Sequence, residues 1–419
     1  MLSLQLIRQD PELVRESLAK RGEASSVDGI LSLDEERRRL IQEVESLRAR
    51  RKQASKEISQ MREKPEALLT EMRDVGERIK SLDSEITRNE EELNDLLLRV
   101  PNLVHPGVPV GRDESDNVVV RSWGEVKTLD FEPLPHWDLG IRLGIIDFER
   151  GVKISGSRFY VLQGWGAKLQ RALIAFMLDL HINEHGYTEV YPPFMVKREC
   201  MLGSGNLPKF ADNLYHDAED DMWFVPTAEV PVTNFHRDEI IEPGLLPFKY
   251  VAYTACFRRE AMSAGKDTRG IKRGHQFDKV ELYKFVEPDV SDDELEKMVA
   301  DAEEVCWKLA LPYRVLQLCS GDLGFNATKS YDIEVWAPGC AEWLEVSSCS
   351  NCIDFQARRS NIRYRSQVGE KLQFVHTLNG SGLALPRVVI AVLESYQQPD
   401  GTVAVPEVLR SYMGTDVIS

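Results

Sequence analysis

The sequence has no long apolar run and few cysteines. No stretch approaches the roughly 18 consecutive apolar residues of a membrane-spanning helix, and seven cysteines are scattered along 419 residues without a disulfide pattern. Such cysteine usage is typical of a reducing compartment. The first 21 residues mix three acidic side chains with basic ones, unlike a signal or transit peptide. We therefore expect a soluble cytoplasmic protein that does not associate with a membrane.

Several chemical motifs are also absent. The sequence contains no Gly-x-x-x-x-Gly-Lys-Ser/Thr phosphate loop, and Gly380-Ser381-Gly382 lacks the third glycine of a dinucleotide-binding turn. Cys349 and Cys352 form a lone Cys-x-x-Cys pair with no second pair and no nearby histidine, so we expect a buried turn there and no zinc. No Ser-His-Asp or Cys-His arrangement is evident either.

A positive charge excess is missing as well. The chain has 52 basic and 68 acidic residues, which gives a net charge of −16. Binding to nucleic acid follows local fields rather than total charge, so a role with RNA would have to come from local basic patches. The length allows two or three domains with a large core.

Residues 31–100 follow a different pattern from the rest. Apolar or long side chains recur at intervals of three and four along two stretches, separated by Lys64-Pro65-Glu66. Because proline ends one helix and is tolerated in the first turn of the next, the pattern predicts an antiparallel coiled-coil hairpin. With about 30 residues per helix it would extend roughly 45–50 Å. We assign residues 1–100 to an N-terminal domain, with one short helix before the hairpin.

The two halves of this arm differ in charge. Residues 37–64 contain ten basic and four acidic side chains, whereas residues 66–95 contain ten acidic and four basic ones. One interpretation is that the helices pair with each other. The other is that a basic stripe faces a phosphate backbone, and the two can hold together. The stripe would consist of Arg48, Arg50, Lys52, Lys56 and Arg62.

The remainder of the chain mixes strands and helices. Residues 101–120 hold three prolines, two glycines and a polar patch without periodicity, which indicates a linker. Residues 121–419 contain several strand-like segments in succession without helices between them. This order favours an α+β domain with an antiparallel sheet over a doubly wound fold. Amphipathic helices are predicted over 165–184, which His185-Gly186 would close, and over 386–397.

Two strand-like segments carry the most informative polar residues. Arg258 and Glu260 lie two positions apart, and Phe277, Lys279 and Glu281 follow about fifteen residues later at the same spacing. Side chains two apart on a strand share a face, so a hairpin would gather a cation, two carboxylates and an aromatic ring. That set suits a substrate with a phosphate, an amine and a flat base, and it predicts a nucleotide-plus-amino-acid site.

Four polar segments occur in order along the chain: 226–229, 257–281, 345–348 and 377–387. The chain also has the three signature segments of class II aminoacyl-tRNA synthetases. They are the helix and strand that end in Pro192, the Phe257-Arg258-x-Glu260 hairpin and Gly382-Leu383-Ala384-Leu385-Pro386-Arg387. With the helical arm, these features make the chain similar to bacterial seryl-tRNA synthetases over essentially its whole length. The resemblance implies a class II catalytic domain over 121–419.

The resemblance also implies a reaction. Serine and ATP with Mg²⁺ would give seryl-adenylate, and the seryl group would pass to tRNA(Ser), with tRNA(Sec) as a further expected partner. Neither step needs a protein nucleophile, because positioning and charge stabilisation can carry the catalysis. The family implies a homodimer with the helix before Pro192 at its interface. Two alternatives stay open: a ligase that charges a carrier protein, whose known relatives lack the arm, and an inactive RNA-binding paralogue.

Roles for the ATP site follow from the resemblance. Arg258 would bridge the serine carboxylate and the α-phosphate, and Arg387 would contact the γ-phosphate. Glu345 and Ser348 would hold Mg²⁺ through ATP. Phe277 would stack on adenine, with a core role as the alternative. The expected ATP-binding residues are Arg258, Arg259, Glu260, Arg269, Phe277, Glu345, Val346, Ser347, Ser348 and Arg387.

The serine end and the loop within the hairpin complete the expected site. Glu281, catalytic together with Arg258 and Arg387, would bind the substrate amine and hydroxyl, unless it pairs with Lys279 or Lys284. The expected serine-binding residues are Thr227, Ala228, Glu229, Arg258, Glu281, Asn379 and Ser381. The basic loop over 261–274 would meet ATP first and the tRNA end second, or would be an ordinary solvated loop. Its expected tRNA contacts are Lys266, Lys272 and Arg273.

Two residues depart from the family pattern. Arg259 stands where a small serine is usual, and Met262 stands where glycine is common. Strand alternation should point Arg259 away from the site. We therefore expect neither change to abolish activity, and the conformation of the loop stays open.

Overall fold

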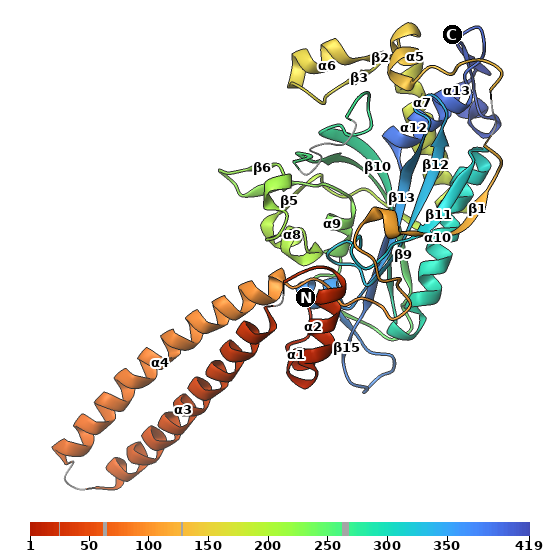
Figure 1. Cartoon of the computed structure of the whole chain (residues 1–419). Coiled ribbons are helices and arrows are strands. Elements are labelled where there is room, and N and C mark those ends of the chain that lie inside the picture. Colours follow the sequence, from red (N-terminus) through yellow and green to blue (C-terminus); the bar gives the residue numbers. More distant parts are fainter. Residues whose placement is uncertain (25, 62–64, 127–128, 262–267) are drawn as a thin grey trace. The chain divides into compact units, whose positions relative to one another are not determined.

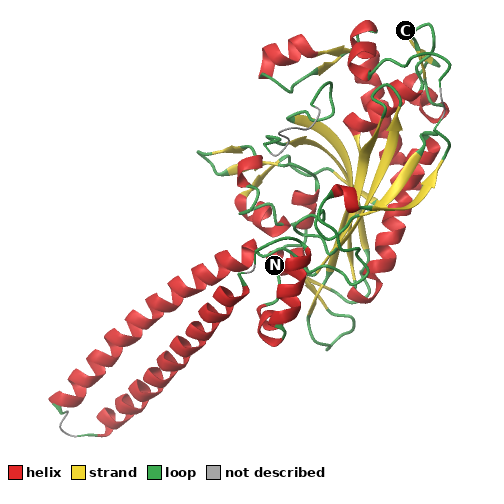
Figure 2. Cartoon of the chain, in the orientation of Figure 1, coloured by secondary structure: helices red, strands yellow, loops and turns green. Residues whose placement is uncertain are grey.

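The computed structural model describes residues 1–24, 26–61, 65–126, 129–261 and 268–419. The chain divides into two compact units. The larger comprises Met1, residues 20–22 and residues 102–419, and the smaller comprises residues 2–19 and 23–101. Figure 1 shows a pair of long helices in the smaller unit and a twisted sheet with packed helices in the larger one. Figure 2, coloured by secondary structure, shows that the arm is helical and that the larger unit contains both helices and strands.

The smaller unit is helical, as predicted. It begins with two short helices, α1 (Leu4–Gln9) and α2 (Pro11–Lys20), where we expected one. The hairpin helices α3 (Val27–Gln60) and α4 (Glu66–Arg99) have 34 residues each, which gives a length of about 50 Å. Helix α3 starts before residue 31 because the apolar period extends to Val27 and Ile30, which are both fully buried.

The hairpin interface follows the apolar period. Leu40 and Val44 of α3 pack with Ile79 and Leu82 of α4 in one hydrophobic cluster. These positions recur every three or four residues, so each helix buries one stripe and leaves the rest in solvent. The predicted antiparallel hairpin is therefore confirmed.

The larger unit is built on an eight-stranded sheet with the order β1-β11-β12-β13-β16-β10-β9-β4. Its strands are β1 (Val118–Trp123), β4 (Thr188–Val190), β9 (Phe248–Phe257), β10 (Gln276–Val286), β11 (Tyr313–Gln317), β12 (Lys329–Ala337), β13 (Glu342–Ile353) and β16 (His376–Ala384). All neighbours pair antiparallel except β4 and β9, which pair parallel at one edge. The predicted α+β fold with an antiparallel sheet is confirmed.

Three helices pack on one face of this sheet: α7 (Trp165–Asn183), α10 (Ser291–Lys308) and α12 (Leu385–Ser395). Their apolar side chains form one large core with Val280 and Leu282 of β10 and Ile333 of β12. Because side chains alternate along a strand, the residues between these positions point to the other face. That opposite face holds the polar residues predicted from the sequence.

Smaller elements frame the sheet. The helices are α5 (His136–Arg142), α6 (Phe148–Ser155), α8 (Arg198–Ser204), α9 (Glu229–Thr233), α11 (Phe355–Ser360) and α13 (Arg410–Met413). The short strands are β2 (Ile146–Asp147), β3 (Val161–Leu162), β5 (Met195–Lys197), β6 (His216–Asp217), β7 (Met222–Phe224), β8 (Ile240–Ile241), β14 (Arg363–Tyr364), β15 (Gln373–Phe374), β17 (Val403–Ala404) and β18 (Val417–Ile418). None of the described helices is long and apolar enough to cross a membrane.

Some expectations about local structure were wrong. Cys349 and Cys352 lie within β13, not in a turn, because that strand continues to Ile353 and both side chains are buried. Strand β1 begins inside the segment 101–120 that we predicted as a linker. Asn102 in that segment donates hydrogen bonds from its amide to two carbonyls, including that of Cys352 at 2.9 Å. Residues 102–117 belong to the larger unit.

Candidate active site

A cavity of about 930 Å³ lies on the polar face of the sheet. Lys279 and Glu281 of β10 line it, while the alternate residues Val280 and Leu282 face the helix-side core. Phe277 also lines the cavity, so the predicted shared face of positions 277, 279 and 281 is confirmed. The core alternative for Phe277 does not hold, because its ring faces this cavity.

Most of the predicted site residues meet in this one cavity. They come from six separate segments of the chain, so the tertiary fold assembles them. Those that line it are Thr227, Glu229, Arg258, Glu260, Lys272, Arg273, Phe277, Glu281, Glu345, Val346, Ser348, Asn379, Ser381 and Arg387. Lys266, Met262 and Arg62 lie outside the described residues.

Four predicted site residues do not line the cavity. Ala228 is fully buried in a separate apolar cluster. Ser347 is buried and donates from Oγ to the Ser381 carbonyl at 2.6 Å. The Arg259 guanidinium donates to the Leu214 carbonyl at 2.9 Å, so it points away from the cavity as predicted, although strand alternation is not the cause because β9 ends at Phe257. Arg269 stacks its guanidinium on a neighbouring indole instead of entering the cavity.

The argument that placed Arg258 and Glu260 together was wrong in its physical basis. Strand β9 ends at Phe257, so strand alternation does not apply to the next three residues. Glu260 has a positive φ of 51°, and its carboxylate lies 3.4 Å from Nη1 of Arg273. Arg258 donates from Nε to the Pro226 carbonyl at 3.2 Å. A turn after the strand, rather than the strand itself, thus brings both side chains to the cavity.

One part of the cavity contains two carboxylates, the buried Glu281 and the half-buried Glu229. Glu281 Oε2 accepts a hydrogen bond from Thr227 Oγ1 at 2.8 Å and forms an ion pair with Lys279. The alternative pairing with Lys279 is therefore present, whereas Lys284 points to the other face. Glu229 accepts from the Gln356 amide at 2.6 Å. Burial and then the charge of Glu281 raise the pKa of Glu229 to about 7.

Another part of the cavity pairs an arginine with a carboxylate. Arg387 Nη1 lies 3.1 Å from Glu345 Oε2 and also donates to the Glu345 carbonyl. Partial loss of hydration acts to raise the pKa of Glu345, but the charges of Arg387, Arg258 and Arg273 outweigh it and hold that pKa below its ordinary value. Arg258 lies close enough for its charge to act on both Glu229 and Glu345.

An oxygen cluster beside this pair fits a divalent cation. Asp332 pairs with Ser348 across β12 and β13. Its Oδ1 atom is buried and has no hydrogen-bond partner among the described residues. Burial and the nearby Glu345 charge raise the pKa of Asp332 well above its usual range. Carboxylate and hydroxyl oxygens are the hard ligands that Mg²⁺ prefers, so this donor set suits the metal.

The sequence reasoning missed several cavity residues. Asp332 and Glu334 of β12 line the cavity, as do Asn117 and Arg314. The polar residues of β12 alternate with buried apolar ones such as Ile333. That period-two pattern would have placed Asp332 and Glu334 on the polar face. Asn117 and Arg314 show no comparable signal.

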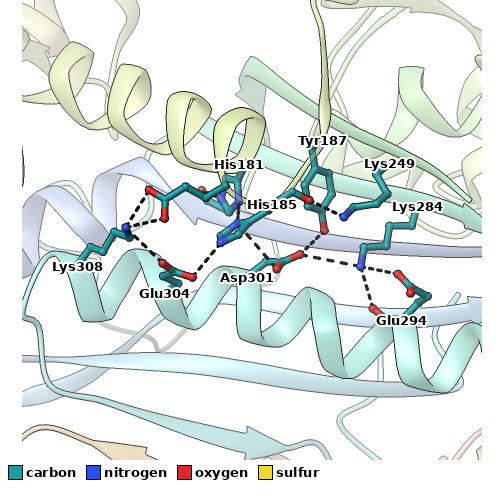
Figure 3. Close-up of polar contacts among 11 residues, drawn as sticks. His181, His185, Tyr187, Lys249, Lys284, Glu294, Asp301, Glu304 and Lys308 are labelled. Carbon is teal, nitrogen blue, oxygen red and sulfur yellow. Dashed lines mark hydrogen bonds and ion pairs between the residues drawn. The ribbon is translucent and has the colours of Figure 1, made fainter.

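A second polar cluster lies on the helix side of the sheet (Figure 3). His181 Nε2 bonds the Gly382 carbonyl at 3.0 Å, and His181 Nδ1 lies 2.9 Å from His185 Nδ1. Because a carbonyl only accepts, the His181 proton is on Nε2 and its Nδ1 accepts from His185. His185 Nε2 bonds Glu304 at 3.0 Å. This chain of bonds ties α7 to β16, next to the cavity residue Ser381.

In the arm, the two helices pair with each other through charged side chains. Arg48 lies 3.0 Å from Asp83, and Arg50 lies 3.1 Å from Glu71. The pairing interpretation therefore holds for these two arginines. Lys52 and Lys56 are exposed on α3. Exposed ion pairs contribute little to stability, so Arg48 and Arg50 can still exchange their partners for phosphates.

Comparison with known proteins covers both units. The family model "Seryl-tRNA synthetase N-terminal domain" matches residues 1–104, and "tRNA synthetase class II core domain (G, H, P, S and T)" matches residues 210–396. A serine–tRNA ligase of Thermomicrobium roseum is 64% identical over 416 residues, 99% of this chain and 94% of that protein. One of Dehalococcoides mccartyi is 61% identical over 418 residues, 100% of both chains.

A solved structure agrees with these matches. The crystal structure of seryl-tRNA synthetase from Pyrococcus horikoshii complexed with ATP is similar to this chain with a TM-score of 0.94. The two are 43% identical, and the match covers 100% of this chain and 99% of that one. The class II fold predicted from the signature segments and the arm is therefore confirmed. The chain belongs to the seryl-tRNA synthetase family.

Proposed function

We propose that this chain is a serine–tRNA ligase. It joins L-serine to ATP to form seryl-adenylate and diphosphate, and then transfers the seryl group to the 3′ end of tRNA(Ser). The relatives from Thermomicrobium roseum and Dehalococcoides mccartyi are named for this activity, and the Pyrococcus horikoshii structure contains ATP. The observation that carries the proposal is the single cavity that unites Arg258, Glu281 and Arg387.

Activation of serine is a displacement at the α-phosphorus of ATP. A serine carboxylate oxygen forms a bond to phosphorus, and the bond to the bridging oxygen breaks, so diphosphate leaves. Negative charge accumulates around phosphorus, and Arg258 stabilises it through charge-assisted hydrogen bonds. Arg258 lines the same cavity as Glu229 and Glu345, and its charge acts on both carboxylates, which supports a bridge from the serine carboxylate to the phosphate.

Serine is recognised by the buried carboxylates. Its ammonium group binds between Glu229 and Glu281, and its hydroxyl bonds Glu281, which Thr227 already orients at 2.8 Å. Asn379 and Ser381 close the same part of the cavity. A site that hydrogen-bonds a hydroxyl rejects an analogue without it by roughly 10⁴–10⁵. Alanine is therefore excluded, and threonine is excluded by the size of the pocket.

The rest of the cavity holds ATP. Phe277 offers a ring face to adenine, and Glu260 accepts from its amino group. Arg387 exchanges its contact with Glu345 for the γ-phosphate. Glu345 and Ser348 would hold Mg²⁺, which would supply positive charge to neutralise the phosphates. Asp332 supports this assignment, because its buried Oδ1 has no partner among the described residues.

The arm and a second copy of the chain are further proposed partners. Helices α3 and α4 contact the tRNA body through phosphates, with tRNA(Sec) as a second substrate. We place the homodimer interface at α7 and at the adjacent α6, whose Val152 and Ile154 are 51% and 73% exposed. Large exposed apolar side chains in sequence neighbours are typical of interaction surfaces. Ile154→Asp should give a monomer in sedimentation equilibrium, and an unchanged dimer would contradict this interface.

The test of the function is serine-dependent ATP–pyrophosphate exchange, followed by charging of tRNA with a long variable arm. Wild type should do both. Arg387→Ala should lose exchange by about 100-fold or more, whereas Arg198→Ala, outside the cavity in an exposed pair with Asp221, should not. No exchange by wild type would reject the enzyme. Exchange without tRNA charging would favour the carrier-protein ligase.

Deletion of the arm separates the two steps. Without residues 31–100, adenylate formation should persist because the cavity lies entirely in the larger unit. Charging of tRNA should be lost because the arm contacts the tRNA body. Equal loss of both reactions would argue that the arm mainly supports folding.

A further inference from the structure

The base of the basic loop is bonded to a buried histidine. The backbone N–H of Ile271 donates to His136 Nε2 at 3.2 Å, and both side chains are fully buried. Because the amide can only donate, Nε2 accepts, and the imidazole proton is on Nδ1. That proton points at Glu394 Oε1, 2.9 Å away. Glu394, from helix α12, therefore fixes the tautomer that lets His136 accept from the loop.

Glu394 holds several elements at once. Its Oε1 also accepts from the His136 backbone N–H at 2.8 Å, and its Oε2 accepts from the Cys340 backbone N–H at 2.9 Å. The Cys340 thiol lies 3.1 Å from Oε1. Partial burial and then the Glu394 charge raise the pKa of this thiol to about 12, so it keeps its proton and donates. A buried carboxylate with this many donors is a rigid anchor.

His136, Cys340 and Glu394 also resemble a metal site, because their possible ligand atoms all lie within 4.8 Å of one another. The hydrogen bonds argue against it. A metal would bind His136 at Nδ1, but Ile271 already occupies Nε2 as a donor and leaves the proton on Nδ1. The thiol of Cys340 would also have to ionise against its raised pKa. The geometry therefore fits a hydrogen-bonded anchor.

The residues next to Ile271 also contact His136 or its neighbour Trp137. Gly270 has a φ of +69°, and a Cβ built on it would lie 1.9 Å from His136 Nε2, so only glycine permits this approach. The Arg269 guanidinium lies 4.8 Å from the Trp137 ring centroid. Lys272 Nζ lies 5.6 Å from the same ring. Four consecutive residues of the loop are thus held on the first turn of α5.

We propose that His136, oriented by Glu394, is a positioning residue for ATP. It holds the C-terminal base of the loop over 261–274 so that Lys272 and Arg273 face the cavity, where both are lining residues. Their charges are then already in position when the phosphates bind, so the loop base does not have to be ordered first. This inference rests on the proposed function, because it assigns ATP phosphates as the ligand of the two cations.

The test displaces the loop base without changing any cavity side chain. Gly270→Ala places a methyl group against His136, and Gly244→Ala is the matched control. Gly244 has a similar φ of +79°, but a Cβ there meets nothing within 4 Å. In pyrophosphate exchange, Gly270→Ala should raise the KM for ATP by about tenfold or more, with the KM for serine within about twofold. Gly244→Ala should match wild type.

Substitution of the histidine provides a second, independent measurement. His136→Leu should raise the KM for ATP and speed hydrogen exchange at the Ile271 amide. His136→Gln, which keeps an acceptor near the Nε2 position, should recover most of both. Even if His136→Leu does not fold, Gly270→Ala still decides the matter.

The outcomes separate this inference from the function itself. If wild type shows no serine-dependent exchange, the proposed function fails. If wild type exchanges but Gly270→Ala equals Gly244→Ala, only the anchor is overturned. Equal effects on the KM for ATP and for serine would also overturn it. If the purified protein contains one equivalent of zinc and Cys340→Ala does not, the three side chains form a metal site and the hydrogen-bonded anchor is overturned.

Discussion

Replacement of Glu229 by glutamine should remove a pH dependence from the stability of the fold. The Glu229 carboxyl is buried beside Glu281, and burial together with that charge raises its pKa from 4.5 to about 7. In the unfolded chain the group ionises at its ordinary pKa. Between these values the folded state keeps a proton that the unfolded state has lost. The free energy of unfolding therefore falls as pH rises through this range.

The magnitude follows from the pKa difference. The free energy of unfolding falls by about 1.4 kcal/mol for each pH unit. Over the interval from 4.5 to about 7 the fall is therefore roughly 3 kcal/mol. Glu229→Gln has no proton to lose and keeps an oxygen and an amide at the same place. Relative to this variant, the free energy of unfolding of wild type should fall by about 3 kcal/mol between pH 4 and pH 8.

Urea unfolding of both proteins at pH 4 and pH 8 measures this quantity. The carboxyl groups distant from Glu229 titrate alike in both proteins, so they cancel in the difference. Glu219→Gln, at an exposed position, controls for the loss of a surface charge. A difference between wild type and Glu229→Gln that stays constant within about 1 kcal/mol would refute the reasoning.

Serine binding gives an independent check of the same group. The substrate ammonium would favour the ionised carboxylate and lower its pKa. Binding near pH 7 should therefore release a proton from wild type and none from Glu229→Gln. Titration calorimetry in two buffers with different ionisation enthalpies detects this proton. Identical apparent enthalpies in both buffers for wild type would place the serine ammonium elsewhere.

Three further predictions concern other parts of the molecule. Glu281→Ala should reduce serine-dependent exchange by about 100-fold or more, since it removes the proposed ligand of the ammonium and leaves Lys279 buried without its partner; retained activity would show that the pocket is misassigned. Joint replacement of Lys52 and Lys56 by glutamine should weaken tRNA binding and reduce the slope of log affinity against log salt by about 2; an unchanged slope would remove these lysines from the interface. Burial, and then the nearby His185, lowers the pKa of His181 to about 3. Wild type should therefore lose stability relative to His181→Gln by about 1.4 kcal/mol per pH unit as pH falls below about 6.5, measured by urea unfolding; parallel pH profiles would contradict this.

Features with a local cause could be predicted from the sequence. The three-and-four spacing of apolar side chains in 31–100 predicted the hairpin, because burial of one helical stripe depends only on the period. The two-residue spacing of Phe277, Lys279 and Glu281 predicted their common face, because side chains alternate along a strand with a period of two. Both patterns are repeated within one element, so no knowledge of its neighbours was needed.

Features that depend on where an element ends were harder to predict. The pleat argument for Arg258 and Glu260 was wrong because β9 stops at Phe257, and a turn with a positive φ at Glu260 orients the pair. The turn expected at Cys349 and Cys352 was wrong because β13 continues through them. Strand ends depend on pairing with distant strands, which a short window of sequence does not contain.

The sequence by itself therefore determined the helical arm, the antiparallel α+β class and the residue types of the nucleotide and amino-acid site. Only the tertiary structure decided how those residues act on one another. It buried Glu229 beside Glu281, and it brought His136 to Glu394 across 258 positions of sequence. Electrostatic energies and hydrogen-bond partners depend on distance in space and on burial. Both are set by packing between segments that no local pattern connects.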